Sequence, residues 1–238
     1  MNLKGDVKSI LEKKYEAVMK FGEISKGDIE ENYSLYSDSG YAFLSNFKRD
    51  GNFKDIVNCS SSGNIESLRI MKYDRHKNCI ESVKFNSEGY LGKKIISKYD
   101  KNNMCFETIY YRSDGSMNFK DHFIYDKNNN ISKIFVYRSP GSLDCHYEYK
   151  FSDDDNLIET IKFSSDGVKE LITTLKYNEL NDCIESIEIW YHDYGDRKFI
   201  IRSTYKYDKH NNWIEKIEYT GENEKLKSII EREIKYYN

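Results

Sequence analysis

A repeat of 26 residues is the feature that most constrains this fold. Each unit begins at an aromatic residue, and the first five intervals between these residues are 26 residues long, whereas the last is 30. The aromatic residues are Phe47, Tyr73, Tyr99, Tyr125, Phe151, Tyr177 and Tyr207. Self-similarity at a period of about 20–50 residues is typical of tandem arrays, in which neighbouring units bury a shared core. The sequence therefore predicts one repeat array.

Two positions in each unit favour residues that tolerate a positive backbone φ angle, which predicts two tight turns. Counted from the aromatic residue, position +4 holds Gly, Asn or Asp in six of the seven units and Lys77 in the other. Position +16, or its equivalent in the longest unit, holds Gly63, Gly89, Gly115, Gly141, Gly167, Gly195 and Asn223. Both positions fit the last residue of a three-residue hairpin loop. Each unit is therefore predicted to contain two strands and two hairpin turns.

This turn pattern sets an expected register for the strands. Position 0 should lie opposite +6, and +12 opposite +18, so that the even positions of a unit share one face. Expected pairs include Tyr125–Ile131, Tyr111–Met117, Ile109–Phe119 and Ile161–Leu171. Even positions are mostly apolar or aromatic and odd positions mostly polar, which is typical of an antiparallel sheet with one buried face. We therefore predict a mainly β fold, a single long antiparallel meander that curls into a half-pipe or an open barrel-like shell.

Residues 1–35 lie outside the repeat and are predicted to cap the array, which then occupies residues 36–238. Val7, Leu11, Val18 and Phe21 recur at helical spacing, so we expect a short helix over about 5–21. A strand over residues 6–15 is the alternative. Residues 29–36 are predicted to form a further strand, which ends in a turn at residues 37–40.

One unit runs Tyr-Asp-Lys-His-Asn-Asn-Trp over residues 207–213, and residues 231–237 run Glu-Arg-Glu-Ile-Lys-Tyr-Tyr. Together with the opening Leu-Lys-Gly-Asp-Val-Lys-Ser-Ile of residues 3–10, this pattern resembles the YD-type (RHS-like) repeat proteins of Bacteroidetes and other low-GC bacteria. It departs from them where the Gly at +4 becomes Asn, Asp or Lys, and where Tyr-Asp becomes Phe151-Ser152. The resemblance implies a β-repeat shell, often exported, of unknown molecular function, and it supplies no catalytic residues.

Six of the seven units carry an acid at position +8, on the face that this register assigns to the aromatic residues. A row of acids beside tyrosine rings suits a sugar or a cationic peptide. The alternative is that the acids bond tyrosine hydroxyls or cross-strand bases, as Asp55 would with Arg69. The candidate ligand face consists of Glu81, Glu107, Glu159, Glu185, Glu215, Tyr99, Tyr125 and Tyr207.

Position +7 lies on the otherwise polar face and is apolar in five units, with breaks at Lys54 and Ser132. Position +23, expected directly opposite, adds Ile70 and Ile96. An apolar stripe on a solvated face is usually covered, here either by the N-terminal segment or by a partner protein or second copy of the chain. The candidate partner stripe consists of Ile80, Phe106, Ile158, Ile184 and Ile214.

The sequence shows no legible catalytic or metal-binding motif. Residues 153–156 resemble a calcium loop in composition only, because the spacing of an EF-hand loop is missing. Cys79 and Cys105 would lie two strands apart, about 9–10 Å, which is too far for a disulfide. All five cysteines, Cys59, Cys79, Cys105, Cys145 and Cys183, are therefore expected to be free thiols. We expect no enzyme activity, no cofactor and no bound metal.

The overall charge and hydropathy narrow the function classes further. The formal net charge of −3 gives no basic surface for nucleic acid. No apolar run approaches the roughly 20 residues of a membrane-spanning helix. Residues 1–27 lack the apolar core of a signal peptide, which predicts a cytoplasmic protein, or an exported one if a leader was removed.

Three functions fit these features. The first is a non-enzymatic binding or scaffolding protein. The second is a carbohydrate- or peptidoglycan-binding protein that uses the candidate ligand face. The third is an immunity or antitoxin-type protein that blocks a toxin. The expected partner is accordingly a protein or a glycan, and the sequence leaves the oligomeric state open.

Overall fold

The computed structural model describes residues 3–20, 22–29, 42–47, 53–59, 64–139 and 141–237, without the side chains of residues 29, 42–44, 47, 53 and 59. These residues form strands joined by turns, and no helix occurs among them. The strands are β1 (Val7–Lys20), β2 (Glu23–Ile29), β3 (Ala42–Phe47), β4 (Phe53–Cys59), β5 (Ile65–Tyr73), β6 (Cys79–Asn86), β7 (Leu91–Tyr99), β8 (Cys105–Tyr111), β9 (Met117–Tyr125), β10 (Ile131–Arg138), β11 (Ser142–Phe151), β12 (Leu157–Ser164), β13 (Lys169–Tyr177), β14 (Cys183–Trp190), β15 (Arg197–Tyr207), β16 (Trp213–Thr220) and β17 (Lys225–Tyr236).

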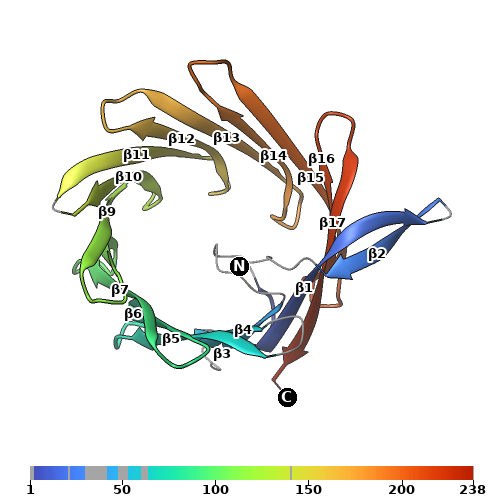
Figure 1. Ribbon diagram of the computed structural model, residues 1–238, viewed down its shortest axis with the longest axis horizontal. Helices are drawn as coiled ribbons and strands as arrows, with labels where there is room; N and C mark the ends of the chain where they lie inside the picture. The colour runs from blue at the N-terminus through green and yellow to red at the C-terminus, as the bar shows by residue number, and fades with distance from the viewer. Residues whose placement is uncertain are drawn as a thin grey trace. The chain divides into compact units, whose positions relative to one another are not determined.

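The predicted antiparallel meander is confirmed in each of the two compact units of the chain (Figure 1). Residues 1–71, 83–92 and 202–238 form the first unit, and residues 72–82 and 93–201 form the second. In the second unit each strand from β7 to β14 pairs antiparallel with the next one along the chain. In the first unit β3, β4 and β5 pair in the same way, as do β16 and β17.

The prediction of an N-terminal helix is wrong, and the alternative of a strand is right. Strand β1 pairs with β17 along one edge, and with β3 and β2 along the other (Figure 1). Ile10 and Glu12 are 1% and 0% exposed, so burial follows the two-residue period of a strand. A half-pipe would leave β3 and β17 as free edges. Both are hydrogen-bonded to β1, so the half-pipe prediction is wrong as well. Of the strand predicted for residues 29–36, the structure describes residue 29, which ends β2. The rest of that strand and the turn predicted for residues 37–40 lie outside the described residues.

The predicted turn positions are largely confirmed. Among the predicted residues, Gly89, Gly115, Gly141, Gly167 and Gly195 have positive φ angles, and so do the residues at +4 from Lys77 to Asn211. The prediction for Asn223 is wrong. The last loop spans four residues, and Glu224 has a positive φ of 52° instead of Asn223. Gly63 lies outside the described residues.

In the repeat hairpins whose register is described, a β-bulge next to the turn corrects the predicted register. Tyr125 lies opposite Ile131 as expected, but Ile124 then lies opposite Lys133, so that Ser132 is an extra residue. A bulge also lies next to the second turn of the unit. Tyr111 lies opposite Met117, whereas Ile109 lies opposite Lys120 rather than Phe119. Ile161 likewise faces Ile172 instead of Leu171. Since each bulge adds one residue, position +8 pairs with position −1 and not with −2.

The register gives the sheet a tyrosine face and a lysine face. The tyrosine face carries position 0, and the lysine face carries positions −1 and +8, because neighbouring residues of a strand point to opposite sides. In the Tyr99 unit, Tyr99 pairs with Cys105 on the tyrosine face, and Lys98 pairs with Glu107 on the lysine face. The same arrangement holds for Tyr177 with Cys183.

The most regular residues of the repeat act within the fold. In the first turn of the Tyr99 unit, the Asp100 carboxylate accepts hydrogen bonds from the backbone N–H groups of Asn102 and Met104, at 2.8 Å each. The Tyr99 hydroxyl donates to the Cys79 carbonyl of the preceding unit at 3.0 Å. Asn78 donates to the Asn103 side chain of the following unit at 3.1 Å. These contacts tie successive hairpins together, so they explain the Tyr-Asp-x-x-Asn-Asn pattern without any ligand.

In the last unit, the equivalent asparagine contacts the N-terminal segment. Asn212 accepts from the Lys4 backbone N–H at 2.8 Å and donates to the Lys4 carbonyl at 2.7 Å. Its side chain also donates to the Tyr236 hydroxyl at 2.8 Å. Residues before β1 therefore take the place that the next repeat unit would occupy.

Candidate functional site

The acids at position +8 pair with lysines across the strands, on the lysine face. The ion-pair distances are 2.7 Å for Lys98–Glu107, 2.8 Å for Lys176–Glu185, 2.8 Å for Lys206–Glu215 and 3.5 Å for Lys94–Glu81. Glu159 lies opposite Lys150. The expectation that acids and position-0 aromatic residues share a face is wrong, because the bulge shifts the acids to the other side. Of the two interpretations of these acids, pairing with cross-strand bases is the one that the structure supports.

Glu107 shows how firmly these pairs are held. Its carboxylate also pairs with Lys120 at 3.3 Å. The pKa of Glu107 is lowered, and the hydrogen bond from Lys98 is the largest cause. The hydrogen bond from Lys120 lowers this pKa further, whereas partial burial acts in the opposite direction. Asp55, in contrast, accepts from the Asn46 amide at 2.6 Å and lies opposite Ile70, not opposite Arg69 as expected.

The tyrosines of the candidate ligand face lie apart from the acids. The Tyr125 hydroxyl donates to the Cys105 carbonyl at 2.6 Å, just as Tyr99 bonds Cys79. Tyr207 lies beside the Tyr205 ring, with 6.1 Å between the ring centroids. The rings of Tyr99 and Tyr125 therefore act between repeat units, and position 0 does not form one surface with the glutamates.

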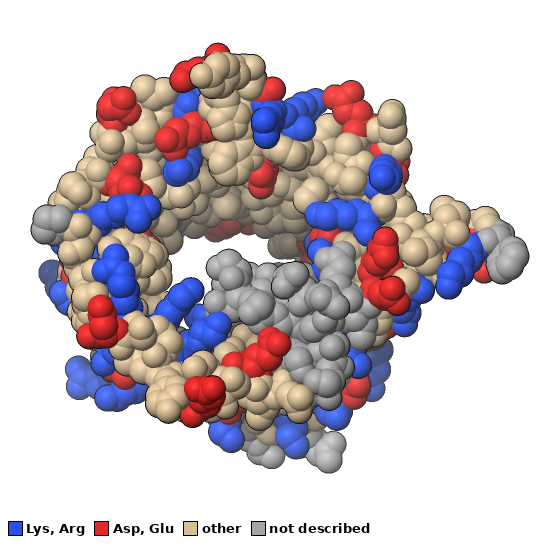
Figure 2. Space-filling model, viewed as in Figure 1, with Lys and Arg blue, Asp and Glu red and all other residues tan. Residues whose placement is uncertain are grey.

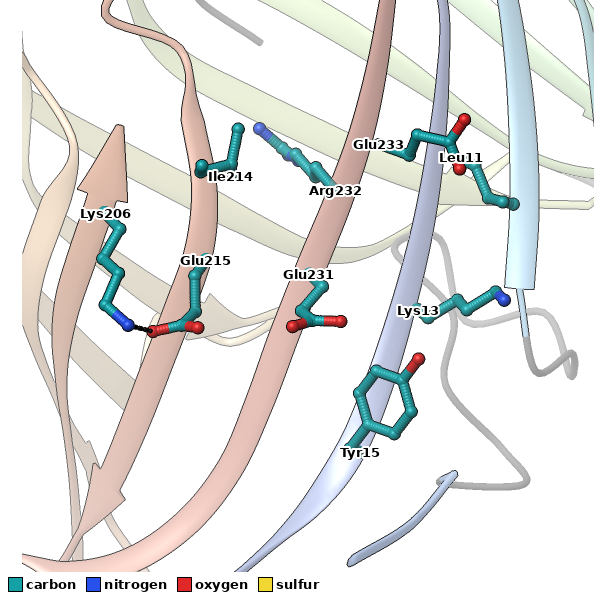
Figure 3. A pocket seen from close by; sticks show the side chains of 9 residues that line it. All are labelled: Leu11, Lys13, Tyr15, Lys206, Ile214, Glu215, Glu231, Arg232 and Glu233. Carbon is teal, nitrogen blue, oxygen red and sulfur yellow. Dashed lines mark ion pairs between the residues drawn. The ribbon is translucent and has the colours of Figure 1, made fainter. Parts of the chain in front are cut away.

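A pocket of about 350 Å³ lies within the first unit, where β15, β16, β17 and β1 run side by side (Figure 3). Of the predicted site residues it contains Glu215 and Ile214, from the last repeat unit. The other lining residues were not among the predicted site residues. The full lining is Leu11, Lys13, Tyr15, Lys206, Ile214, Glu215, Glu231, Arg232 and Glu233.

Register explains how these charges come together. Glu215 lies opposite Glu231, which in turn lies opposite Lys13, so the row of charges continues from β16 through β17 to β1. Lys206 extends it to β15 through its ion pair with Glu215 (Figure 3). Two adjacent carboxylates are thus flanked by an ammonium group on each side, which keeps the pocket near electrical neutrality.

Further contacts hold the pocket in shape. Glu231 pairs with Lys26 of β2 at 2.6 Å, and this hydrogen bond raises the pKa of Lys26. The Lys26 ammonium lies 5.1 Å from the centre of the Tyr15 ring. Arg232 pairs with the buried Glu12 at 2.6 Å, and its guanidinium lies 3.3 Å from the centre of the Trp213 ring. The alternation of charged residues in Glu231-Arg232-Glu233 was the available sequence signal for this site.

In the candidate partner stripe, Phe106, Ile158 and Ile184 are the extra residues of first-turn bulges. Phe106, Ile184 and Ile214 are 38%, 36% and 36% exposed, while Ile80 and Ile158 are partly buried. Position +23 was expected opposite +7, but it lies opposite +8. In the Tyr99 unit, His122 at +23 pairs with Glu107 at +8. The N-terminal segment does not cover this stripe as a helix, because it forms strand β1.

The cysteines and acidic turns show no sign of a metal site in the part of the chain that the structure describes. Cys79, Cys105, Cys145 and Cys183 are free thiols, and the Cys59 side chain lies outside the description. The described residues contain no cluster of three or more potential metal ligands. Asp155 is the positive-φ residue of its turn and accepts from the Asn130 amide at 2.8 Å. Figure 2 shows acidic and basic residues intermixed over the visible face.

Comparisons with known proteins show a shared fold and no family. No protein-family model and no curated protein sequence matches the chain. A structural likeness at a TM-score of 0.41 connects it with a porin-like protein from Bacteroides vulgatus, at 13% identity over 85% of this chain and 96% of the other. A likeness at 0.38 connects it with the Tc holotoxin pore of Photorhabdus luminescens, at 13% identity over 96% of this chain and 11% of the other. Both scores are too low to support an argument.

A stronger likeness connects the chain with a porin-like protein from Bacteroides uniformis. The TM-score is 0.61 at 8% sequence identity, and the match covers 98% of each chain. None of the described residues forms a helix long and apolar enough to cross a membrane. At this identity the comparison concerns architecture alone, so the chain has the fold of that porin-like protein.

Proposed function

We propose that this chain is a non-enzymatic binding protein whose ligand site is the pocket between β15, β16, β17 and β1. The observation that carries the proposal is the convergence of charged side chains from the last repeat unit with Lys13 and Tyr15 of the non-repeat strand β1. Elsewhere the Lys–Glu pairs lie on the open lysine face. Here they line a concave space large enough for a small ligand.

The chemistry of the pocket favours a polyhydroxyl ligand without a large net charge. Carboxylates accept hydrogen bonds from hydroxyl or amino groups, and the lysines and Tyr15 donate them. Leu11 and Ile214 add an apolar surface for the ring of a sugar. These features support a short glycan or peptidoglycan fragment as the ligand class.

The test is a calorimetric titration of the full-length protein with chitooligosaccharides and peptidoglycan fragments. Glu215→Gln should weaken binding by about tenfold, since a hydrogen bond to a charged group contributes about 1.5–3 kcal/mol. Glu185→Gln is the matched control, because Glu185 occupies the same repeat position and also pairs with a lysine at 2.8 Å. Equal losses in both variants, or no binding of any fragment, would exclude the pocket as a glycan site.

Protein association is a second candidate, supported by the exposure of Phe106 and Ile184 on the lysine face. If a second copy of the chain covers this stripe, the double variant Phe106→Glu, Ile184→Glu should sediment as a monomer while the parent protein dimerises. Tyr194→Glu serves as the control, because Tyr194 is fully exposed but lies outside the stripe. A parent protein that sediments as a monomer at every concentration would rule out this candidate.

A further inference from the structure

The carboxylate of Asp121 has an unusual setting on the tyrosine face of the second unit. Within the described residues its hydrogen-bond partner is the Tyr110 hydroxyl, which donates to it at 3.0 Å, and no lysine or arginine pairs with it. Burial raises the pKa of Asp121, although the bond from Tyr110 opposes the change. The Glu–Lys pairs of the other face show that this chain usually places a base beside a partly buried acid. Asp121 lacks such a base.

Aromatic rings surround this carboxylate on its own strand and on β8. Phe119 and Phe123 lie two residues before and after Asp121 on β9, so their side chains share its face. The Tyr110 ring stacks on Phe119, with 4.1 Å between the ring centroids. The rings also limit the access of water to the carboxylate, which makes its missing counter-charge more costly.

Two further tyrosines approach from β11. Val136 lies opposite Asp121, and Cys145 lies opposite Val136, so that the short side chain of Val136 separates Asp121 from Cys145 on β11. Tyr147 and Tyr149 follow on the same face, with ring centroids 6.4 Å apart. Burial raises the pKa of both hydroxyls to about 12, and the Asp121 charge contributes to each shift. Both rings therefore lie within the electrostatic field of Asp121.

We propose that Asp121, Tyr110, Tyr147 and Tyr149 form a binding site for an organic ammonium ion. The carboxylate supplies the counter-charge, and the tyrosine rings attract a cation through their negatively polarised faces. A single carboxylate offers too few oxygen ligands for calcium or magnesium, whereas an alkylated ammonium needs only a charge partner and aromatic walls. All four side chains remain partly accessible, so a small ion can reach them. This site is separate from the pocket of the first unit.

The test is a calorimetric titration of the full-length protein with choline and with 3,3-dimethyl-1-butanol, its uncharged carbon analogue. Choline should bind at one site, and the analogue at least about tenfold more weakly, because only the charge differs. Asp121→Asn should lower choline affinity by about tenfold or more while keeping an acceptor for Tyr110. Asp144→Asn is the control, since Asp144 already pairs with Arg138 at 2.6 Å, and it should leave the affinity unchanged.

A second variant keeps the proposal testable if Asp121→Asn does not fold. Tyr149→Leu should lower the affinity for choline several-fold and leave the weak binding of the uncharged analogue as it is, because it removes one ring and no charge. Three results would overturn the proposal: no binding of choline, equal binding of choline and the analogue, or full choline affinity in a folded Asp121→Asn protein.

Discussion

Arg232→Met is expected to destabilise the protein by about 3–5 kcal/mol, the largest effect of any single substitution considered for this chain. The Arg232 and Glu12 side chains are 6% and 0% exposed and pair at 2.6 Å. Removing the guanidinium leaves the Glu12 carboxylate buried without its arginine, and it also removes the cation that stacks on Trp213 at 3.3 Å. The destabilised region is the junction between β17 and β1, which joins the N-terminal strand to the end of the array.

Urea denaturation monitored by circular dichroism measures this effect, provided that the slope of the transition is unchanged. Lys206→Met is the matched control. It removes a base from the Glu215 pair at 2.8 Å, but the lysine side chain is 71% exposed, so the loss should stay below about 1 kcal/mol. The double variant Glu12→Met, Arg232→Met should recover most of the stability, because a packed apolar pair can replace a buried ion pair. Similar losses for Arg232→Met and Lys206→Met would contradict the buried junction.

The turns of this fold could be predicted from composition because a positive φ angle strongly selects the residue type. Gly at +16 and Asn or Asp at +4 mark the loop ends, and their spacing gives the two-strand unit. The bulges could not be found in the same way, since an extra residue on one strand leaves no compositional trace. One signal was nevertheless present. Lysine at −1 recurs wherever glutamate occupies +8, as in Lys98 with Glu107, and opposite charges favour direct cross-strand neighbours.

The N-terminal strand and the pocket could not be predicted from local sequence. Val7, Leu11 and Val18 have helical spacing, and a buried glutamate at position 12 is implausible on a strand considered alone. Glu12 is buried because Arg232, 220 residues later in the chain, supplies its counter-charge. The pocket depends on the same long-range pairing, because Lys13 reaches Glu231 only when β1 lies beside β17. Tertiary contacts therefore decided the features that periodicity assigned wrongly.

Gly115→Val is expected to cost about 1–3 kcal/mol more than Ser113→Val in the same exposed loop. Gly115 has a φ of +82°, a region that a β-branched residue enters only under strain, whereas Ser113 is not among the positive-φ residues. An added Cβ at Gly115 would meet no atom within 4 Å, so the cost comes from the backbone and not from a clash. The unfolding free energies of the two variants, measured in urea, give the difference directly.

Gly115→Asn separates backbone strain from the loss of glycine itself. The chain already places asparagine in this conformation at Asn129, where φ is 67°. Asparagine tolerates the left-handed region better than valine because its short polar side chain can bond to the local backbone. The expected order of stability is therefore the parent protein first, then Gly115→Asn, then Gly115→Val. Equal losses of unfolding free energy for Gly115→Asn and Gly115→Val would mean that the added side chain, and not the φ angle, causes the destabilisation. This loop would then not depend on a left-handed residue.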